Sequence, residues 1–314
     1  MYPRFADYRI SSFSFARMQS ALLLVPDLSL ILIGWLLVRY TSFDRQFWSG
    51  VEKLAYYVLF PAMLFYATSR AAFDFSSTPA MLGLALLTTG IGVILGYAGR
   101  WMFRPDPLDF ASGLQTAFRF NGYIALAVAA RVGGEQGVAL MALIQGCVVP
   151  LVNVIAVWQL SRTSSVSVWR ELLRNPLILA TVLGTAANLL GLQMPEVLAM
   201  VLGRLGSAST ALGLMAVGAG LQLTGASVPY GIVAWWTAVK LLAMPAFAYF
   251  AARYFPLTQL QLQIAVLFAS LPTATNAYIL AVRLGGNGVL VATVVSIMTL
   301  CAVITMPLWL ALIM

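Results

Sequence analysis

The stretch Leu271–Gly286 reads LPTATNAYILAVRLGG and interrupts a long apolar segment near the end of the chain. A continuous membrane-spanning helix would carry apolar residues here, but this stretch has Pro272, Thr273, Thr275 and Asn276. Proline lacks a backbone N–H, and its ring clashes with the preceding helical turn. Because hydrocarbon offers no water to the freed carbonyl groups, protein, ligand or cavity water must satisfy them. The stretch therefore predicts a broken spanning helix.

A second stretch, Arg119–Gly134, reads RFNGYIALAVAARVGG and repeats the same features. Its Asn-Gly-Tyr-Ile matches Asn-Ala-Tyr-Ile in the later stretch, and both copies continue to Arg-x-Gly-Gly. Interrupted segments at corresponding positions of two halves are the best indication in a sequence of a transporter's substrate site. The alternative interpretation is a pair of ordinary kinks packed against neighbouring helices.

The two breaks have the chemistry of an anion site. The backbone N–H groups and the helix dipole at the start of each second half-helix favour an anion. Asn121 and Asn276 each lie at a break, and an amide can donate to a carboxylate while its oxygen accepts from backbone. The candidate substrate-binding residues are Arg119, Asn121, Gly122, Tyr123, Pro272, Thr273, Thr275, Asn276 and Tyr278.

The composition indicates a membrane protein, because the chain of 314 residues is 61% hydrophobic and 9% charged, with a mean hydropathy of +0.91. Soluble domains carry more surface charge. Repeated apolar runs of about 20 residues, the length that crosses a bilayer, predict an all-α polytopic membrane protein. Histidine is absent, and Cys147 and Cys301 fall in apolar runs, so we expect no metal site, no cofactor and no catalytic centre. The net charge of +8 comes from short loops and does not indicate nucleic acid.

The apolar runs predict ten spans, five in each half. They cover about 21–38, 51–68, 80–102, 110–130, 137–160, 176–192, 205–223, 228–251, 258–282 and 289–312. An odd number of spans per half gives the halves opposite orientations, so we predict two inverted five-helix repeats with crossing broken helices four and nine. The corresponding segments are a tail (1–19), a first repeat (20–160), a connecting loop (161–174) with a short interfacial helix, and a second repeat (175–314).

The distribution of lysine and arginine predicts the orientation. The loops on one side of the predicted membrane carry nine basic residues and the opposite loops four, or seven with the tail included. Basic loops face the cytoplasm, so we expect a cytoplasmic connecting loop and two periplasmic termini in a bacterial inner membrane. Residues 1–17 fit neither a signal peptide nor a structural element, and we expect translation to begin at Met18.

Three charged residues within the spans are candidates for supporting roles. A charge inside a membrane is costly and is by default a functional hypothesis. Arg119 lies roughly 14 Å into its span at 1.5 Å per residue, and the alternative is that it extends to the surface. Lys240 lies near the middle of a span, where its partner is either the substrate or an exposed carbonyl of a broken helix. Asp27, near the start of the first span, fits a solvated helix start better than a proton carrier.

Four motifs resemble the auxin efflux carrier family, within the bile-acid and auxin transporter-like superfamily: PDLSLILIGWLLVR, FPAMLF, KLLAMP and LPTATNAYILAVRLGG. The resemblance covers 20–314 and implies a scaffold of spans 1, 2, 6 and 7. It also implies a transport domain of spans 3–5 and 8–10 that moves like an elevator, with Asn121 and Asn276 at the cross. Plant relatives carry auxin, and bacterial relatives are assigned dicarboxylates such as malonate. Bacterial members commonly have Asn-Thr-Gly-Phe-x-Gly-x-Pro at the first break, where this chain has NGYIA, so the substrate stays open.

These observations predict a secondary transporter that exports small organic anions, an auxin-like monocarboxylate or a dicarboxylate, across the lipid bilayer. Asp27 is the acidic residue that we assign to the spans, whereas the groups near the breaks favour an anion. The expected mechanism is therefore uncoupled uniport driven by the membrane potential. The alternatives are a sodium- or proton-coupled symporter of the bile-acid type, a channel and an intramembrane enzyme. A homodimer is left open.

Overall fold

In the computed structural model, the structure describes residue 26 and residues 28–70, 77–160, 176–221, 228–274 and 276–313. Within these ranges every regular element is a helix, which confirms the all-α prediction. Four expectations lie outside the described residues: the start at Met18, the interfacial helix of the connecting loop, Asp27 and Thr275. The side chain of Asn276 also lies outside them, although its backbone begins a helix.

The helices follow one another with short connections. The first half contains a helix at Leu28–Tyr40, α2 (Arg45–Leu54), η1 (Ala55–Leu59), α3 (Phe60–Arg70), α4 (Thr78–Phe103), α5 (Pro107–Gly113), η2 (Leu114–Ala117) and α6 (Gly122–Leu160). The second half contains α8 (Pro176–Leu189), α9 (Glu196–Ala219), α10 (Tyr230–Ala238), η3 (Val239–Ala243), α11 (Met244–Ala251), η4 (Ala252–Tyr254), α12 (Gln259–Ser270), α13 (Asn276–Arg283) and α14 (Gly288–Ile313).

Among the described residues, five helical segments are long and apolar enough to cross a membrane. They are Thr78–Phe103, Pro107–Leu160 (which contains α5, η2 and α6), Glu196–Ala219, Tyr230–Tyr254 and Gly288–Ile313. Shorter apolar helices lie at Leu28–Tyr40, Leu179–Leu189 and Gln259–Ser270. The chain is therefore a helical integral membrane protein. Some of the predicted spans are divided into shorter pieces, because the helix changes type or breaks within them.

Both predicted breaks are present. The segment of α5 and η2 ends at Ala117 and α6 begins at Gly122, while α12 ends at Ser270 and α13 begins at Asn276. Proline disfavours helical backbone in the residue before it, and Leu271, before Pro272, is extended with φ −63° and ψ 142°. Sequence alone was thus sufficient to locate both interruptions.

A kink divides α6 where the sequence predicts a connection between two spans. Gly133 and Gly134 have non-helical backbone angles, and Gly134 has a φ of 55°. This left-handed conformation is easily adopted by glycine, which has no Cβ. The kink therefore separates a helix that begins at the first break from the helix that continues to Leu160.

Proline also explains two π-helical turns. Each lies just before a proline, η1 before Pro61 and η3 before Pro245. Proline has no N–H and its ring crowds the preceding helical turn, and at both sites the residue before proline makes a wider bond, to the carbonyl five residues earlier. Thus Phe60 N donates to the carbonyl of Ala55 in one turn, and Met244 N donates to that of Val239 in the other.

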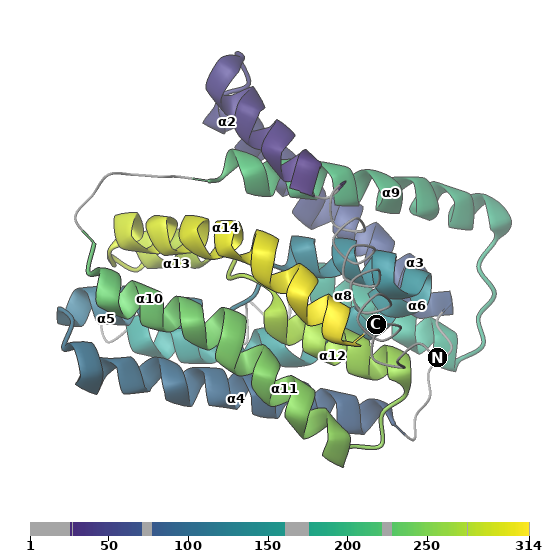
Figure 1. Ribbon diagram of the computed structural model, residues 1–314. Helices are drawn as coiled ribbons and strands as arrows, with labels where there is room; N and C mark the ends of the chain where they lie inside the picture. The colour runs from purple at the N-terminus through teal and green to yellow at the C-terminus, as the bar shows by residue number, and fades with distance from the viewer. Residues whose placement is uncertain are drawn as a thin grey trace, which may run out of the picture.

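Figure 1 shows α9 along one side of the molecule and α4 along the opposite side, with α6 and α12 between them. α3 packs chiefly against α8 and α9, and α12 packs against α6, α4, α11 and α14. These contacts define two groups of helices, one of α3, α8 and α9 and the other of α4, α6, α11, α12 and α14. α3 also contacts α6, so the two groups meet along α6. The fully buried aromatic side chains Phe60, Phe118, Trp236 and Phe268 belong to this continuous core.

Two glycines bring the Leu28–Tyr40 helix into direct backbone contact with α9. A Cβ on Gly34 would lie 1.9 Å from the carbonyl oxygen of Met215, and one on Gly218 would lie 1.8 Å from that of Ile31. Each distance is far below van der Waals contact, so no other residue fits without separating the helices. We call this contact the glycine seam.

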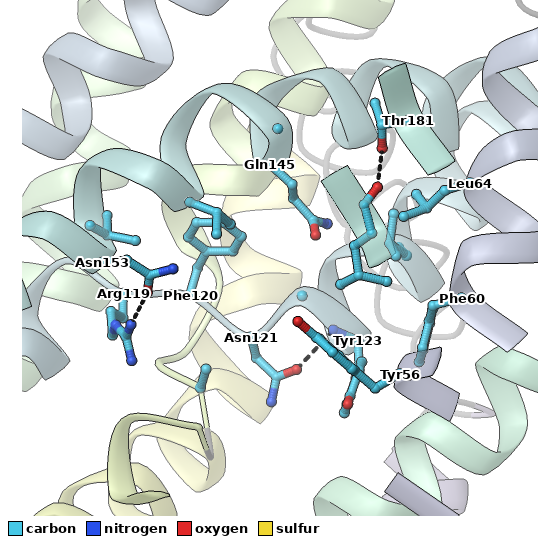
Figure 2. Close-up of a pocket in the computed structure, with 17 residues that line it drawn as sticks. Tyr56, Phe60, Leu64, Arg119, Phe120, Asn121, Tyr123, Gln145, Asn153 and Thr181 are labelled. Carbon is cyan, nitrogen blue, oxygen red and sulfur yellow. Dashed lines mark hydrogen bonds between the residues drawn. The ribbon is translucent and has the colours of Figure 1, made fainter. Parts of the chain in front are cut away.

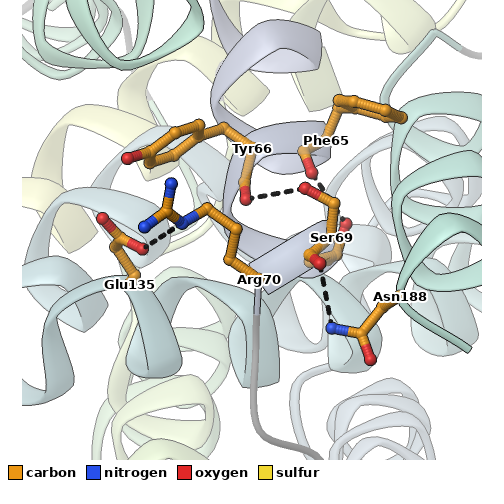
Figure 3. Close-up of polar contacts among 7 residues, drawn as sticks. Phe65, Tyr66, Ser69, Arg70, Glu135 and Asn188 are labelled. Atoms are coloured by element: carbon orange, nitrogen blue, oxygen red, sulfur yellow. Dashed lines mark hydrogen bonds and ion pairs between the residues drawn. The ribbon is translucent and has the colours of Figure 1, made fainter. Parts of the chain in front are cut away.

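Polar contacts at the end of α3 connect it to two other helices (Figure 3). The amide of Asn188, near the end of α8, donates to the carbonyl of Ser69 at 3.0 Å. Arg70 forms a 3.6 Å ion pair with Glu135 of α6, and both side chains are about half exposed. Exposed pairs of this kind contribute about 0–1 kcal/mol, so packing rather than charge holds these helices together.

Candidate functional site

The two breaks contact each other directly. Asn121 N donates to the carbonyl of Pro272 over 2.8 Å. Close by, the buried amide of Gln115 donates to the carbonyl of Ala277 over 3.2 Å. These bonds join segments of the first half to segments of the second, and the first of them satisfies the carbonyl of Pro272, which lies in the break outside any helix.

The oxygen and the nitrogen of the Asn121 side-chain amide have different surroundings. Its Oδ1 accepts from Tyr123 N at 3.0 Å and Ile124 N at 3.2 Å, which caps the start of α6. Its Nδ2 is buried and has no hydrogen-bond partner. The sequence predicts that free backbone N–H groups meet an anion, but at this break the side chain already occupies two of them. The donor that remains is the amide NH2 group.

A cavity of about 170 Å³ lies beside Asn121 (Figure 2). Its polar lining consists of Tyr56, Arg119, Asn121, Tyr123, Gln145, Asn153 and Thr181. Its apolar lining includes Phe60, Leu64, Val149 and Leu177. The lining comes from η1, α3 and α8 on one side and from the first break and α6 on the other, so the cavity lies where the two groups of helices meet.

Gln145 is a second residue of the cavity lining with an unpartnered donor. It is 7% exposed, and its Nε2 has no hydrogen-bond partner. Its Oε1 lies 3.1 Å from where a Cβ on Gly122 would be, so glycine at that position leaves room for the amide. The sequence analysis missed Gln145 as a site residue. A glutamine in the middle of an apolar span was the available signal.

Arg119 is held in the cavity wall. Only 5% of its surface is exposed, and its guanidinium donates to Oδ1 of Asn153 (Figure 2). The alternative that this side chain extends to the membrane surface is therefore wrong. A buried arginine offers several N–H donors in one plane, a geometry that matches the two oxygens of a carboxylate.

The second break contributes less to the cavity than the sequence suggested. Ala274 lines it, whereas Pro272, Thr273 and Tyr278 do not. Thr273 is fully buried with an unpartnered hydroxyl, and Tyr278 packs in a separate small cluster with Ala277 and neighbours on α14. Arg119, Asn121, Gly122 and Tyr123 are brought together at the cavity.

Lys240 lies in η3 and is fully buried. Its Nζ donates to the carbonyl of Ala269 over 2.9 Å and lies 5.9 Å from the centre of the Phe268 ring. Of the two partners that the sequence allowed, the structure therefore places a carbonyl of a broken helix against this lysine. Lys240 is not part of the cavity lining.

Glu52 is a carboxylate that the sequence analysis overlooked. It lies on α2 inside the predicted second span, it is half-buried, and it interacts electrostatically with Tyr123. Tyr123 in turn stacks on Phe60, with ring centres 4.6 Å apart and planes 5° from parallel. The expectation that the acidic residues of the spans are limited to Asp27 is thus wrong, and the exception lies one helical turn before Tyr56.

Comparisons with known proteins show what this chain is similar to. The family model described as membrane transport protein matches this chain over residues 21–160 and 157–310. A protein of Rhizobium meliloti (strain 1021) with the name "Putative malonate transporter" is 26% identical over 298 residues. That alignment covers 88% of this chain and 92% of the relative.

Proposed function

Because the chain belongs to the membrane transport protein family, the auxin efflux carriers, we propose that it is a secondary transporter exporting a small organic anion. It is a transporter rather than an enzyme. The observation that carries the proposal is the cavity, which is lined by Asn121 and Gln145, each with an unpartnered amide donor, and by the buried Arg119. An ionised carboxylate only accepts hydrogen bonds, and these groups only donate to it.

The relative's name makes malonate the first ligand to test. In our proposal one carboxylate accepts from the amides of Asn121 and Gln145, and Arg119 binds a second carboxylate if the substrate has one. Each unmet buried donor has a free-energy cost of about 1–3 kcal/mol, which a bound carboxylate would remove. Phe60, Leu64 and Leu177 would contact the carbon skeleton.

A thermal-shift screen of the purified protein tests this assignment. A ligand that binds only the folded state raises the melting temperature. We expect malonate to stabilise more than acetate or an aromatic monocarboxylate, with methylmalonamide, which has no charge, as the control. Stabilisation by none of these acids would contradict the assignment of the cavity as an anion site.

We also propose the finer architecture: ten spans in two inverted five-helix repeats, with spans 1, 2, 6 and 7 as scaffold and the rest as transport domain. The composition of the cavity walls supports it, since Tyr56 and Thr181 come from scaffold spans while Arg119 and Asn121 come from the transport domain. Movement of one group past the other would open the cavity alternately to each side. Both termini would then be periplasmic in a bacterial inner membrane, so a fluorescent reporter that matures only in the cytoplasm should stay dark after Met314.

Uniport is the proposed coupling mode. An interior-negative membrane expels an anion with about 2.3 kcal/mol per charge per 100 mV, which sustains a gradient of roughly fiftyfold. In proteoliposomes, an imposed potassium diffusion potential should drive malonate flux, and reversing the potential should reverse the flux. Counterflow of labelled malonate would distinguish this carrier from a channel.

Proton-coupled transport is the second candidate, because Glu52 is half-buried near Tyr123 and could exchange a proton beside the cavity. If protons are coupled, a pH gradient drives flux without a membrane potential, and Glu52→Gln abolishes that flux while voltage-driven flux remains. If the carrier is a uniporter, Glu52→Gln leaves voltage-driven flux within about twofold and a pH gradient alone drives none.

A further inference from the structure

The end of α12 has carbonyl groups that the helix itself cannot pair. Leu271 is extended and Pro272 has no N–H, so the usual donors beyond the last turn are missing. The hydroxyl of Ser270 reaches back to the carbonyl of Leu267 at 2.9 Å. The carbonyl of Ala269 accepts instead from Lys240, which belongs to a different helix.

The ammonium group of Lys240 lies at the end of a half-helix, the kind of position at which other transporters bind a cation. The last turn of a helix carries a partial negative charge that favours a cation. In transporters with broken helices, the exposed carbonyls at the end of a half-helix bind the coupling ion, commonly Na⁺. Lys240 is fully buried, is near the ring face of Phe268 and has no carboxylate partner among the described residues. Its charge is therefore met by a carbonyl and a ring, the neutral partners that a metal cation would also use.

We propose that Lys240 is a built-in cation that holds the second break together, so that the carrier needs no sodium ion to assemble its anion site. The effect on the anion rests on the proposed function, whereas the effect on the fold does not. Lys240 is a positioning residue, since it does not line the cavity.

A short chain of bonds connects Lys240 to the cavity. The ammonium fixes the carbonyl of Ala269, and three residues later the carbonyl of Pro272 accepts from Asn121 N. Asn121 lines the cavity, and its Nδ2 has no hydrogen-bond partner. Loss of the ammonium would loosen the break that supports Asn121 without removing any group that contacts the ligand.

The first experiment uses stability and needs no ligand. The melting temperature of the purified wild-type protein is measured in sodium chloride and in N-methylglucamine chloride at equal concentration, and we expect the same value in both. Lys240→Ser shortens the side chain and leaves room for an ion, so it should melt lower in N-methylglucamine and recover part of the loss in sodium. Lys240→Met fills the space without a charge and should melt lower in both salts, whereas the exposed Lys53→Ser should behave as wild type.

The second experiment measures malonate affinity in the same two salts. Wild-type affinity should not depend on sodium, and Lys240→Ser should bind about tenfold more weakly, with sodium reversing part of the loss. A wild-type protein that melts higher or binds more tightly in sodium would overturn the proposal, and so would a serine variant that sodium does not rescue. If the serine variant cannot be purified, the wild-type comparison still decides. Failure of the wild-type protein to bind malonate would count against the proposed function alone, because the stability experiment contains no malonate.

Discussion

The two breaks look alike in sequence, yet the structure completes them in different ways. At the first break the chain tightens into a 3-10 turn, and the N–H groups of Phe118 and Arg119 both donate to the carbonyl of Gln115, at 3.4 and 3.0 Å. At the second break Leu271 is extended instead, and the carbonyl of Ala269 is met by a lysine from another helix. The first break closes with its own backbone, whereas the second depends on a distant side chain.

This difference decides what each buried cation can do. Arg119 lies on the first break and faces the cavity, where a ligand can reach it. Lys240 is committed to the second break and lies outside the cavity lining. The comparison teaches that a buried charge near a transport site has two distinct uses. It can bind the substrate, or it can pair a carbonyl of the broken helix that positions the substrate-binding residues.

The largest effect should come from reversing the chemistry at Asn121. Asn121→Asp keeps an oxygen that can cap α6 but replaces the free NH2 donor with negative charge, so malonate affinity should fall by more than about a hundredfold. Asn121→Ala should weaken binding about ten- to a hundredfold and also destabilise the cap by about 1 kcal/mol. Calorimetric titration and thermal melting measure the two effects separately. Equal losses of malonate affinity from the same changes at Asn276 would show that both breaks bind the anion, contrary to the difference described above.

Arg119→Met should give the next largest effect. It removes the cation from the cavity, and hydrogen bonds to charged groups contribute about 1.5–3 kcal/mol, so malonate affinity should fall by up to about a hundredfold. Its melting temperature should show no dependence on sodium, in contrast to Lys240→Ser. The exposed Arg204→Met is the matched control and should bind as wild type. A sodium-dependent melting temperature in Arg119→Met would mean that both cations support the backbone.

Gln145→Leu should reduce malonate affinity by about tenfold, since it removes one neutral donor and keeps the volume of the side chain. The folded protein should be as stable as wild type or slightly more stable, because the unpartnered amide is removed with it. The exposed Gln193→Leu serves as control. Unchanged affinity in Gln145→Leu would mean that the anion binds only to Arg119 and Asn121, the two residues of the first break.

The smallest effect is expected from the surface ion pair of Arg70 and Glu135. Both side chains are about half exposed, so Arg70→Met should change the free energy of unfolding by less than about 1 kcal/mol and the rate of malonate counterflow by less than about fivefold. Glu135→Gln should match it. A large change in rate from either variant would mean that a surface contact, and not the two breaks, controls movement.

The sequence was sufficient to find the breaks because their cause is local. A proline removes a donor wherever it stands in a helix, and the paired Asn motifs marked both interruptions. It also predicted that Arg119 and Asn121 share a site, since both lie at one break. Tyr278 and Thr273 were assigned by the same proximity, but neither lines the cavity, and Tyr278 packs instead against α14.

The remaining features depend on contacts between segments far apart in the chain. Gln145 and Glu52 belong to no repeated motif, and only the packing of their helices places them near the first break. The partner of Lys240 is 29 positions away and could be chosen only once the end of α12 was located in space. Apolar periodicity gives no information on such distances.

The glycine seam has a consequence for genetic screens of this protein. Any substitution at Gly34 or Gly218 forces two backbones apart, so such mutants should lose transport although neither glycine lines the cavity. A screen that scores growth alone would rank these glycines beside Asn121 and Arg119. Immunoblots of membrane fractions would separate the classes, because seam mutants disappear from the bilayer while cavity mutants persist at normal abundance.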